Sequence, residues 1–577
     1  MKGGGDQMQN GASRVGITLK GIWNKLAGTP GKRVHVVILL VAALYMIAHV
    51  VLGTWLCAVL IQASSPFLAL MVTVTLVVAV GNVVVAAPLW VYSAITLIRG
   101  PRPIATVPAP VPDLDLPEII VQIPGRHEAS EHVCRSIDSV LGADYPPDKL
   151  RVQFIDNSDD GRWTEVARLY EAEARVRVEH RDGTKGFKAG NLNIGLERLA
   201  PFADPGRVLI GVLDVGDTFA PQAIRPMATE FVHDERLGFV QGMFRIGNPR
   251  DTIISWSDSY VGDAARRFVE GYIAHYGIPT LNGHCALLRL EALEDSGGWN
   301  GSRVAEDWSA GITMMTRGWA GKWVDYEPAN PAMVSTELVP GEITGQQKQK
   351  RRWATGGTEL AKLHLLEWMR SPLPWNQRLS LFLRLGANFS VLPGFVAQLL
   401  FPLWIAAALL GEGSGVVLAF GIISTLVQNP FMLANSTAAL NYARERNWRT
   451  AIAVVLAYPI QAFWRLPLFS HAAVGIMEGL SGGLKTFVIT PKSSEDLTVL
   501  GILTSQRLVI GVSLASVMPL ILTLVMRPHH IDLLLLAAVS LPILTIGALF
   551  LVPLTKWIRR RVLPRRQRRL SVHPAPS

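Results

Sequence analysis

The chain has little charge for its length. Only 17% of its 577 residues are Asp, Glu, Lys or Arg, whereas a soluble domain usually carries about a quarter. The deficit is concentrated in four stretches that hold a single charged residue, Glu412: Val34–Ile98, Leu385–Ala443, Leu508–Met526 and Leu533–Thr555. A membrane-spanning helix takes about 20 predominantly apolar residues. The lengths of the stretches therefore predict an integral multi-pass membrane protein with about six spans.

Cysteine is also scarce. The chain has three, Cys57, Cys134 and Cys285, and no two of them are close enough in sequence for a zinc-binding pattern. This excludes a disulfide-built domain and a cysteine-ligated zinc site, and it favours buried, unreactive thiols.

The positive charge that is present lies next to the predicted spans. Residues 1–33 are basic before the first span, and seven arginines lie between Arg559 and Arg569 after the last. Positive residues near span ends stay in the cytoplasm, so both ends of the chain and the block between the second and third spans are expected there. Beside a membrane, the basic tail indicates contact with anionic lipid rather than with nucleic acid.

These features divide the chain into segments. Six prolines between positions 101 and 117 mark a linker before the most acidic part of the chain. The apolar stretch Thr450–Trp464 is short for a span and fits an interfacial or re-entrant helix. The predicted segments are 1–33 basic, 34–99 two spans, 100–117 linker, 118–357 soluble domain, 358–384 interfacial helices, 385–443 two spans, 444–506 an interfacial helix and a loop, 507–557 two spans, and 558–577 basic tail.

Within 118–357, short runs rich in aliphatic residues alternate with helical stretches. Such alternation predicts an α/β domain with a parallel sheet covered by helices. The predicted strands are Ile119–Ile123, Val152–Ile155, Val176–Glu179, Val208–Leu213 and Gly238–Gln241, and the helices include Glu131–Leu141 and Trp163–Ala172.

Acidic residues follow three of the predicted strands: Glu128, Asp156, and the pair Asp214 and Asp217. Ligands of such sheets bind at the carboxyl ends of the strands. Carboxylates there can hold a divalent cation together with substrate phosphate oxygens. Any one of these acidic residues, taken alone, fits an ordinary turn residue equally well. The presence of three such groups at one edge of the sheet favours a ligand-binding site.

Further motifs follow in a characteristic order: Lys188-Ala189-Gly190, Asp214-x-x-Asp217, Asn282-Gly283-His284, Gly297-Gly298-Trp299, Glu306-Asp307 and Gln349-x-x-Arg352-Trp353. This order resembles the family 2 glycosyltransferases, and within them the cellulose, curdlan and mannan synthase group. The resemblance covers residues 118–357. It implies a cytoplasmic, GT-A-type (Rossmann-like) glycosyltransferase domain inserted in the transmembrane bundle, and residence in a bacterial inner (plasma) membrane.

The resemblance also implies roles. Asp307, supported by Glu306, is the expected base for the acceptor hydroxyl in an inverting displacement. Asp214 and Asp217 are expected to place Mg²⁺ or Mn²⁺ on the donor diphosphate, and Arg352 suits phosphate oxygens. The expected substrate-binding residues are Asp156, Glu128, Lys188, Gln349, Arg352, Trp353, Thr490 and Lys492, the last two in Phe487–Lys492, which is similar to the substrate-closing loop of cellulose-synthase-like enzymes.

The motifs depart from the family pattern in three places. The metal motif has four residues instead of three, so which of Asp214 and Asp217 binds the metal stays open. The first motif reads Arg126-His127-Glu128 where the family has Tyr-Asn-Glu, and Ala305 stands where the family has Thr. The resulting Ala-Glu-Asp sequence also occurs in ceramide glucosyltransferases. The role of His284 stays open, because this residue fits either the acceptor path or a structural role.

We therefore expect an inverting enzyme that moves a hexose, by default from UDP-glucose, to a growing β-linked polysaccharide and couples this to translocation. The partners would be a nucleotide-diphospho-sugar, the glycan, the bilayer and an accessory subunit across the membrane. Single-sugar transfer to a lipid acceptor is the alternative. A transporter or membrane receptor is a third hypothesis. It does not explain Asp307 or the Gln349-Arg352-Trp353 motif, since such a protein has no catalytic role for them. The sugar and the linkage stay open.

Overall fold

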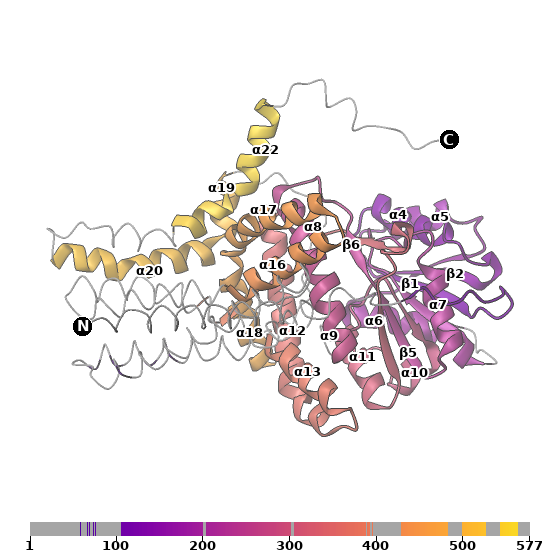
Figure 1. Cartoon of the computed structure of the whole chain (residues 1–577). Helices are drawn as coiled ribbons and strands as arrows, with labels where there is room; N and C mark the ends of the chain where they lie inside the picture. Colours follow the sequence, from indigo (N-terminus) through magenta and orange to yellow (C-terminus); the bar gives the residue numbers. More distant parts are fainter. Residues whose placement is uncertain are drawn as a thin grey trace, which may run out of the picture.

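The computed structural model describes residues 106–199, 204–301, 305–387, 429–482, 499–526 and 543–562, with a few single positions besides. An α/β domain lies at one end of the molecule, and helices from α12 onward extend away from it (Figure 1). The predicted spans in 34–99 and most of those in 385–443 lie outside the described residues, as do the linker residues 100–105 and most of the basic ends.

The α/β domain is built on one seven-stranded sheet, in the order β3-β2-β1-β4-β7-β5-β8. A separate pair of parallel strands joins β6 to β9. The strands are β1 Glu118–Gly125, β2 Leu150–Asp156, β3 Val176–His180, β4 Val208–Val212, β5 Leu237–Gly242, β6 Phe244–Ile246, β7 Ala286–Arg289, β8 Ala320–Val324 and β9 Ser335–Glu337.

The prediction of an α/β domain is confirmed, and every strand expected from the sequence is present. The expectation of a wholly parallel sheet is wrong, because β7 runs antiparallel between β4 and β5. This strand has only four residues, Ala-Leu-Leu-Arg, all of them buried, so it shows neither alternation nor a hairpin turn. The sheet is therefore mixed.

Helices cover both faces of the sheet because consecutive strand residues point to opposite sides. In β1, Ile119 and Val121 pack into one apolar core, while Ile120 packs into the other. The first core contains residues of α4 Ser130–Leu141, α5 Trp163–Leu169 and α7 Ile224–His233; the second contains residues of α6 Phe187–Glu197, α10 Leu290–Asp295 and α11 Glu306–Thr316.

Two long segments connect this domain to the remaining helices. The first is α8 Ile253–Ala265, which continues through a π-helical turn, Arg266–Glu270, into α9 Gly271–Tyr276. The second is α12, a single helix of 28 residues that runs from Ile343 to Arg370. The other described helices are α13 Trp375–Ala387, α16 Asn429–Arg444, α17 Trp448–Arg465, α18 Leu468–Ser481, α19 Val499–Ser505, α20 Arg507–Met526 and α22 Leu551–Val562.

Helix α12 packs along α18 through small residues. A Cβ on Gly475 would lie 2.4 Å from the backbone oxygen of Arg351, and one on Gly479 would lie 2.6 Å from that of Thr355. The Arg351 guanidinium also pairs with Glu478 of α18. The helix that carries the Gln-x-x-Arg-Trp motif is therefore fixed against the helices beyond the α/β domain.

Among the described residues, no single helix has both the length and the apolar composition needed to cross a bilayer. Helices α17 and α18, which meet at a bend of 60°, satisfy the requirement only together. The six spans stay a prediction.

Candidate active site

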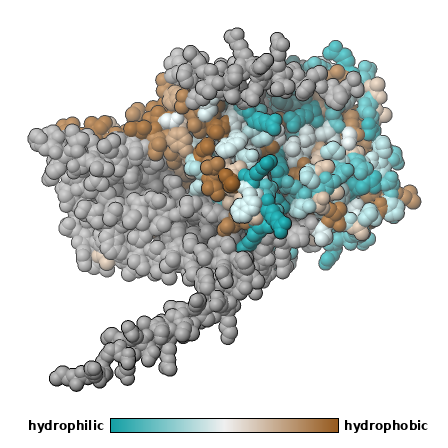
Figure 2. Space-filling view, turned by 45° about the horizontal axis from the view of Figure 1, so that its top comes forward, coloured by the Kyte–Doolittle hydropathy of each residue, from teal (hydrophilic) through white to brown (hydrophobic). Residues whose placement is uncertain are grey.

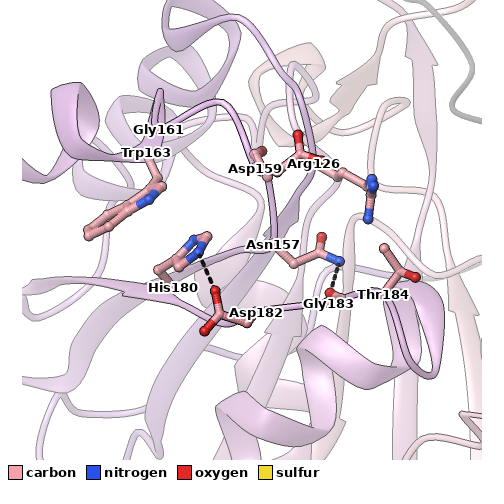
Figure 3. Close-up of a pocket in the computed structure, with 10 residues that line it drawn as sticks. Arg126, Asn157, Asp159, Gly161, Trp163, His180, Asp182, Gly183 and Thr184 are labelled. Atoms are coloured by element: carbon pink, nitrogen blue, oxygen red, sulfur yellow. Dashed lines mark hydrogen bonds and ion pairs between the residues drawn. The ribbon is translucent and has the colours of Figure 1, made fainter.

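A pocket of about 380 Å³ opens at the carboxyl ends of β1, β2 and β3 (Figure 3). The parallel register places Gly125, Asp156 and His180 side by side where these strands end. The rings of Trp163 and His180 stack at 4.9 Å with 12° between their planes. The lining residues are Arg126, Asn157, Ser158, Asp159, Gly161, Trp163, His180, Asp182, Gly183 and Thr184. Flat rings, carboxylates and an arginine around one cavity suit a nucleotide base.

Asp156 is the last residue of β2, directly before the lining residues Asn157, Ser158 and Asp159, and does not itself line the pocket. Its carboxylate accepts hydrogen bonds from the backbone N–H of Ser158 at 2.9 Å and from the Ser158 hydroxyl at 2.7 Å. Its side chain is only 4% exposed. Asp156 therefore shapes the loop after β2. Glu128 lies after the end of β1 and is partly exposed.

A second group of polar side chains surrounds Lys188, in the first turn of α6. The ammonium lies 2.7 Å from an oxygen of Asp214 and 3.8 Å from one of Glu306. It also donates to the carbonyl of Gly283 at 2.7 Å. Burial by itself lowers the pKa of Lys188, but the carboxylates of Asp214, Glu306 and Asp307 outweigh it and raise the pKa. Lys188 is therefore a permanent cation among three acids.

The two acids of the Glu-Asp motif form the first turn of α11. Negative charge is favoured there by the helix dipole and by unpaired backbone N–H groups; Asp307 accepts from the N–H of Trp308 at 2.8 Å. Burial nevertheless raises the pKa of both carboxyls, that of Glu306 to about 7. An acid whose pKa is raised toward neutrality suits proton transfer near pH 7.

The backbone of Gly283 lies directly against the side chain of Asp307. A Cβ at this position would lie 2.7 Å from Oδ2 of Asp307, and the residue has a φ of +71°. The backbone of the Asn-Gly-His segment thus approaches Asp307 as closely as only glycine allows.

The two acids of the metal motif have different environments. The Asp214 side chain is 37% exposed, whereas that of Asp217 is 3% exposed. Asp217 accepts from the N–H of Leu338 at 2.9 Å and lies 3.3 Å from Nδ1 of His284. Nε2 of His284 lies 3.5 Å from Glu337. Asp217 and His284 therefore tie the loop after β4 to β9.

This difference indicates how a divalent cation would fit. Among the described residues, no three His, Cys, Asp or Glu side chains converge as a metal site. Mg²⁺ needs only one or two carboxylates when phosphate oxygens complete its shell. Asp214 is ion-paired with Lys188 but 37% exposed, so it can still present an oxygen to the cation, whereas the Asp217 carboxylate is 3% exposed and lies inside the protein.

We expect replacement of Asp214 by alanine to raise the Mg²⁺ or Mn²⁺ concentration for half-maximal activity at least about tenfold, because this removes the exposed carboxylate. The Asp217→Ala variant is expected to keep the metal requirement and to lose roughly 1–3 kcal/mol of stability, since it leaves a buried N–H without its acceptor. Metal titrations and thermal unfolding of both variants measure these effects. Full activity of both variants after chelation would contradict a metal role.

Glu306 makes stability depend on pH. Its pKa rises from 4.5 in an exposed chain to about 7 in the fold, so between these values the folded form keeps a proton that the unfolded form releases. Stability therefore falls as pH rises through this range. We expect the unfolding temperature of the wild type to fall more steeply between pH 5 and pH 7.5 than that of Glu306→Gln. Parallel profiles would disprove the assignment.

The remaining predicted residues lie on α12. Gln349 and Arg352 are partly buried, and Trp353 is 49% exposed. Helix α12 packs against α11, which carries Asp307. Thr490 and Lys492 lie outside the described residues.

Sequence reasoning missed the Trp163–His180 stack and assigned no definite role to Gly283 or His284. The two stacked residues are 17 positions apart on different elements, so no local pattern joins them. For Gly283 and His284 a signal was present in the sequence, because both belong to the Asn282-Gly283-His284 motif.

Comparison with known proteins supports the resemblance seen in the motifs. Residues 117–356 match the family model described as glycosyltransferase like family 2. The chain is 25% identical over 283 residues to glucomannan 4-beta-mannosyltransferase 1 of Oryza sativa subsp. japonica, which covers 45% of this chain and 51% of that protein. It is 25% identical over 257 residues to glucomannan 4-beta-mannosyltransferase 7 of Arabidopsis thaliana, covering 43% and 44%.

The chain thus spans about half the length of the curated relatives it matches. Among solved structures, a mannosyltransferase from Pyrobaculum calidifontis in complex with GDP-Man and Mn²⁺ is 19% identical, with a TM-score of 0.44; the match covers 66% of this chain and 98% of that one.

Proposed function

Because residues 117–356 form a domain of glycosyltransferase family 2, we propose that the chain moves a hexose, with inversion, from a nucleotide-diphospho-sugar to the end of a growing β-linked polysaccharide. The observation that carries this proposal is the cluster of Lys188, Asp214, Glu306 and Asp307 at the sheet edge that also holds the pocket. It combines a base of raised pKa with a cation and a carboxylate suited to a diphosphate.

The reaction is a single displacement. The carboxylate of Asp307 takes the proton of the acceptor hydroxyl while that oxygen attacks the anomeric carbon of the donor. The bond from this carbon to the diphosphate oxygen breaks, and nucleoside diphosphate leaves. Asp214 would hold Mg²⁺ or Mn²⁺, whose charge stabilises the leaving diphosphate.

Residues of α6 and α12 complete the proposed site. The Lys188 ammonium neutralises the buried acids. It would also pair with an oxygen of the leaving diphosphate. The planar guanidinium of Arg352 suits two phosphate oxygens at once, and Gln349 can add a hydrogen bond. The exposed ring of Trp353 offers a flat face to the acceptor sugar.

For the donor, we place a mannosyl nucleotide first, since the curated relatives are named 4-beta-mannosyltransferases. The default expectation of UDP-glucose has no specific support in these names. The nucleotide base would occupy the pocket with the Trp163–His180 stack (Figure 3).

We further propose that the helices beyond α12 lie in the bilayer. Hydrophobic residues gather on the side of the molecule away from the α/β domain, whose visible face is largely hydrophilic (Figure 2). On α17 and α18 the exposed side chains include Ile452, Val455, Leu456, Met477 and Leu480. An apolar surface of this kind suits lipid.

The test is turnover of donors by the purified full chain in lipid vesicles, with Mn²⁺ and a panel of GDP-mannose, UDP-glucose and UDP-N-acetylglucosamine. We expect one donor to release nucleoside diphosphate while its sugar enters a polymer. If no donor of the panel is turned over, the proposed function is wrong.

A further inference from the structure

Two neighbouring arginines lie in the π-helical turn between α8 and α9, outside the residues used above. Turns of this kind are frequent at functional sites. The side chains of Arg266 and Arg267 are largely buried, with 15% and 8% of their surface exposed. Each guanidinium pairs with its own set of carboxylates, and the two sets belong to different parts of the molecule. The turn therefore makes two separate ionic contacts at one place in the chain.

Arg266 pairs with two carboxylates. One of its terminal nitrogens lies 2.6 Å from an oxygen of Asp263, and the other lies 2.9 Å from an oxygen of Glu337 in β9. Burial by itself lowers the pKa of Arg266, but the carboxylates of Glu337 and Asp263 outweigh it and raise the pKa. Arg266 is therefore a permanent cation that fixes the position of the Glu337 carboxylate.

Two sets of contacts lead from Arg266 to the imidazole of His284. In the first, the other oxygen of Glu337 lies 3.5 Å from Nε2 of His284. In the second, the guanidinium carbon of Arg266 lies 4.8 Å from the centre of the Phe244 ring, and the centre of that ring lies 4.3 Å from the centre of the imidazole. The His284 side chain is only 10% exposed. These contacts, together with Asp217 beside Nδ1, therefore fix the orientation of the imidazole.

His284 belongs to the loop that lies against the proposed base. The preceding residue, Gly283, has its backbone against the side chain of Asp307. The carbonyl of Gly283 also accepts a hydrogen bond from the Lys188 ammonium at 2.7 Å. A displacement of His284 would therefore move the backbone that contacts both Asp307 and Lys188.

We propose that Arg266 is a positioning residue for sugar transfer, because it holds the His284 loop against which Asp307 is placed. This rests on the proposed function. Arg266 acts through His284 and not on the donor itself. Its loss should therefore slow the chemical step, which depends on the placement of the base, more than it weakens binding of the donor.

Arg267 supplies the matched control. Its guanidinium lies 3.2 Å from Asp325, directly after β8, and 3.3 Å from Glu445, directly after α16. Neither carboxylate belongs to the two sets of contacts that lead to His284. Loss of Arg267 should therefore lower the stability of the fold, as loss of Arg266 does, without releasing the His284 loop.

The first experiment measures kcat and donor KM of the full chain in lipid vesicles, with Mn²⁺ and the donor that the wild type turns over. We expect Arg266→Gln to reduce kcat at least about tenfold while donor KM changes less than about twofold, since the base is displaced and the donor contacts remain. Arg266→Lys keeps a cation beside Glu337 and should restore part of the rate. Wild-type kcat in Arg266→Gln, or an equal loss of kcat in Arg267→Gln, would overturn the proposal.

A double variant tests whether Arg266 and Glu337 act along one path. Glu337→Gln removes one of the two sets of contacts to His284, so it should reduce kcat less than Arg266→Gln does. Combining the two substitutions should cost no more than Arg266→Gln alone, because residues of one network are not additive. Losses that multiply in the double variant would contradict a shared path through His284.

Hydrogen exchange tests the same proposal without any donor. The N–H of Asn282 donates to the side chain of Gln241 at 2.8 Å, so its exchange with solvent requires the loop to open. By mass spectrometry of the full chain in detergent, we expect exchange across residues 282–285 to be faster in Arg266→Gln than in the wild type and unchanged in Arg267→Gln. Unchanged exchange in Arg266→Gln would show that this residue does not hold the loop. If the wild type turns over no donor, the proposed function fails, and exchange still decides whether Arg266 positions the loop.

Discussion

Replacing Asp307 by asparagine is expected to reduce sugar transfer by at least about 10²–10⁴-fold, the usual contribution of a general base. Asparagine keeps the shape of the side chain and can still accept from the Trp308 N–H, so the first turn of α11 should stay intact. It has no basic oxygen to take the acceptor proton. Initial rates at saturating donor, together with donor affinity by calorimetry, measure the two effects separately.

The matched control is Asp295→Asn, which changes an exposed carboxylate at the end of α10 that pairs with Arg317, the residue after α11. This variant should transfer sugar at the wild-type rate. Donor affinity in Asp307→Asn should stay within a few-fold of wild type, because Lys188 and Asp214 remain. Undiminished turnover by Asp307→Asn would remove Asp307 from the proposed mechanism.

The second large effect is expected from Gly283→Ala. The new methyl group would lie 2.7 Å from Oδ2 of Asp307, where carbon atoms are essentially never found. Either the base or the loop must move, and a displacement of about 1 Å near the reacting atoms can cost about 10²-fold in rate. We therefore expect a loss of at least about 100-fold in kcat.

Gly297→Ala separates this clash from backbone strain. Gly297 has a φ of +88°, yet no atom lies within 4 Å of the position of its Cβ. Both variants should lose roughly 1–2 kcal/mol of stability, the cost of a left-handed conformation for a residue with a Cβ. Only Gly283→Ala should lose activity. Equal activity of the two variants would show that Gly283 does not position the base.

The sequence anticipated much of the α/β domain because its strands are apolar and follow the alternation of helix and strand closely. It did not reveal β7, whose four residues carry no period of their own, and so it could not show that the sheet is mixed. It also divided α12 at residue 357, since the polar Gln349–Arg352 segment and the apolar residues after it differ in composition. In the structure they form one continuous helix.

The candidate site shows the same limits. Motif order placed Lys188, Asp214, Glu306 and Asp307 together, because all follow strands of one sheet or begin helices at its edge. The sequence treated Asp214 and Asp217 alike, and only their surroundings distinguish an exposed carboxylate from one bound to Leu338 and His284. The pocket depends on contacts between distant elements, such as the stack of Trp163 on His180, which no local pattern contains.

The measurement that tests the central claim most directly is the size and linkage of the product. The purified full chain in lipid vesicles would be given Mn²⁺ and, one at a time, radiolabelled GDP-mannose and UDP-glucose, and the lipids would then be extracted. The proposed function predicts a long β-linked polymer that resists lipid extraction and is absent with Asp307→Asn. Label that passes entirely into the lipid fraction as one sugar per acceptor would contradict polymer synthesis and favour single-sugar transfer to a lipid.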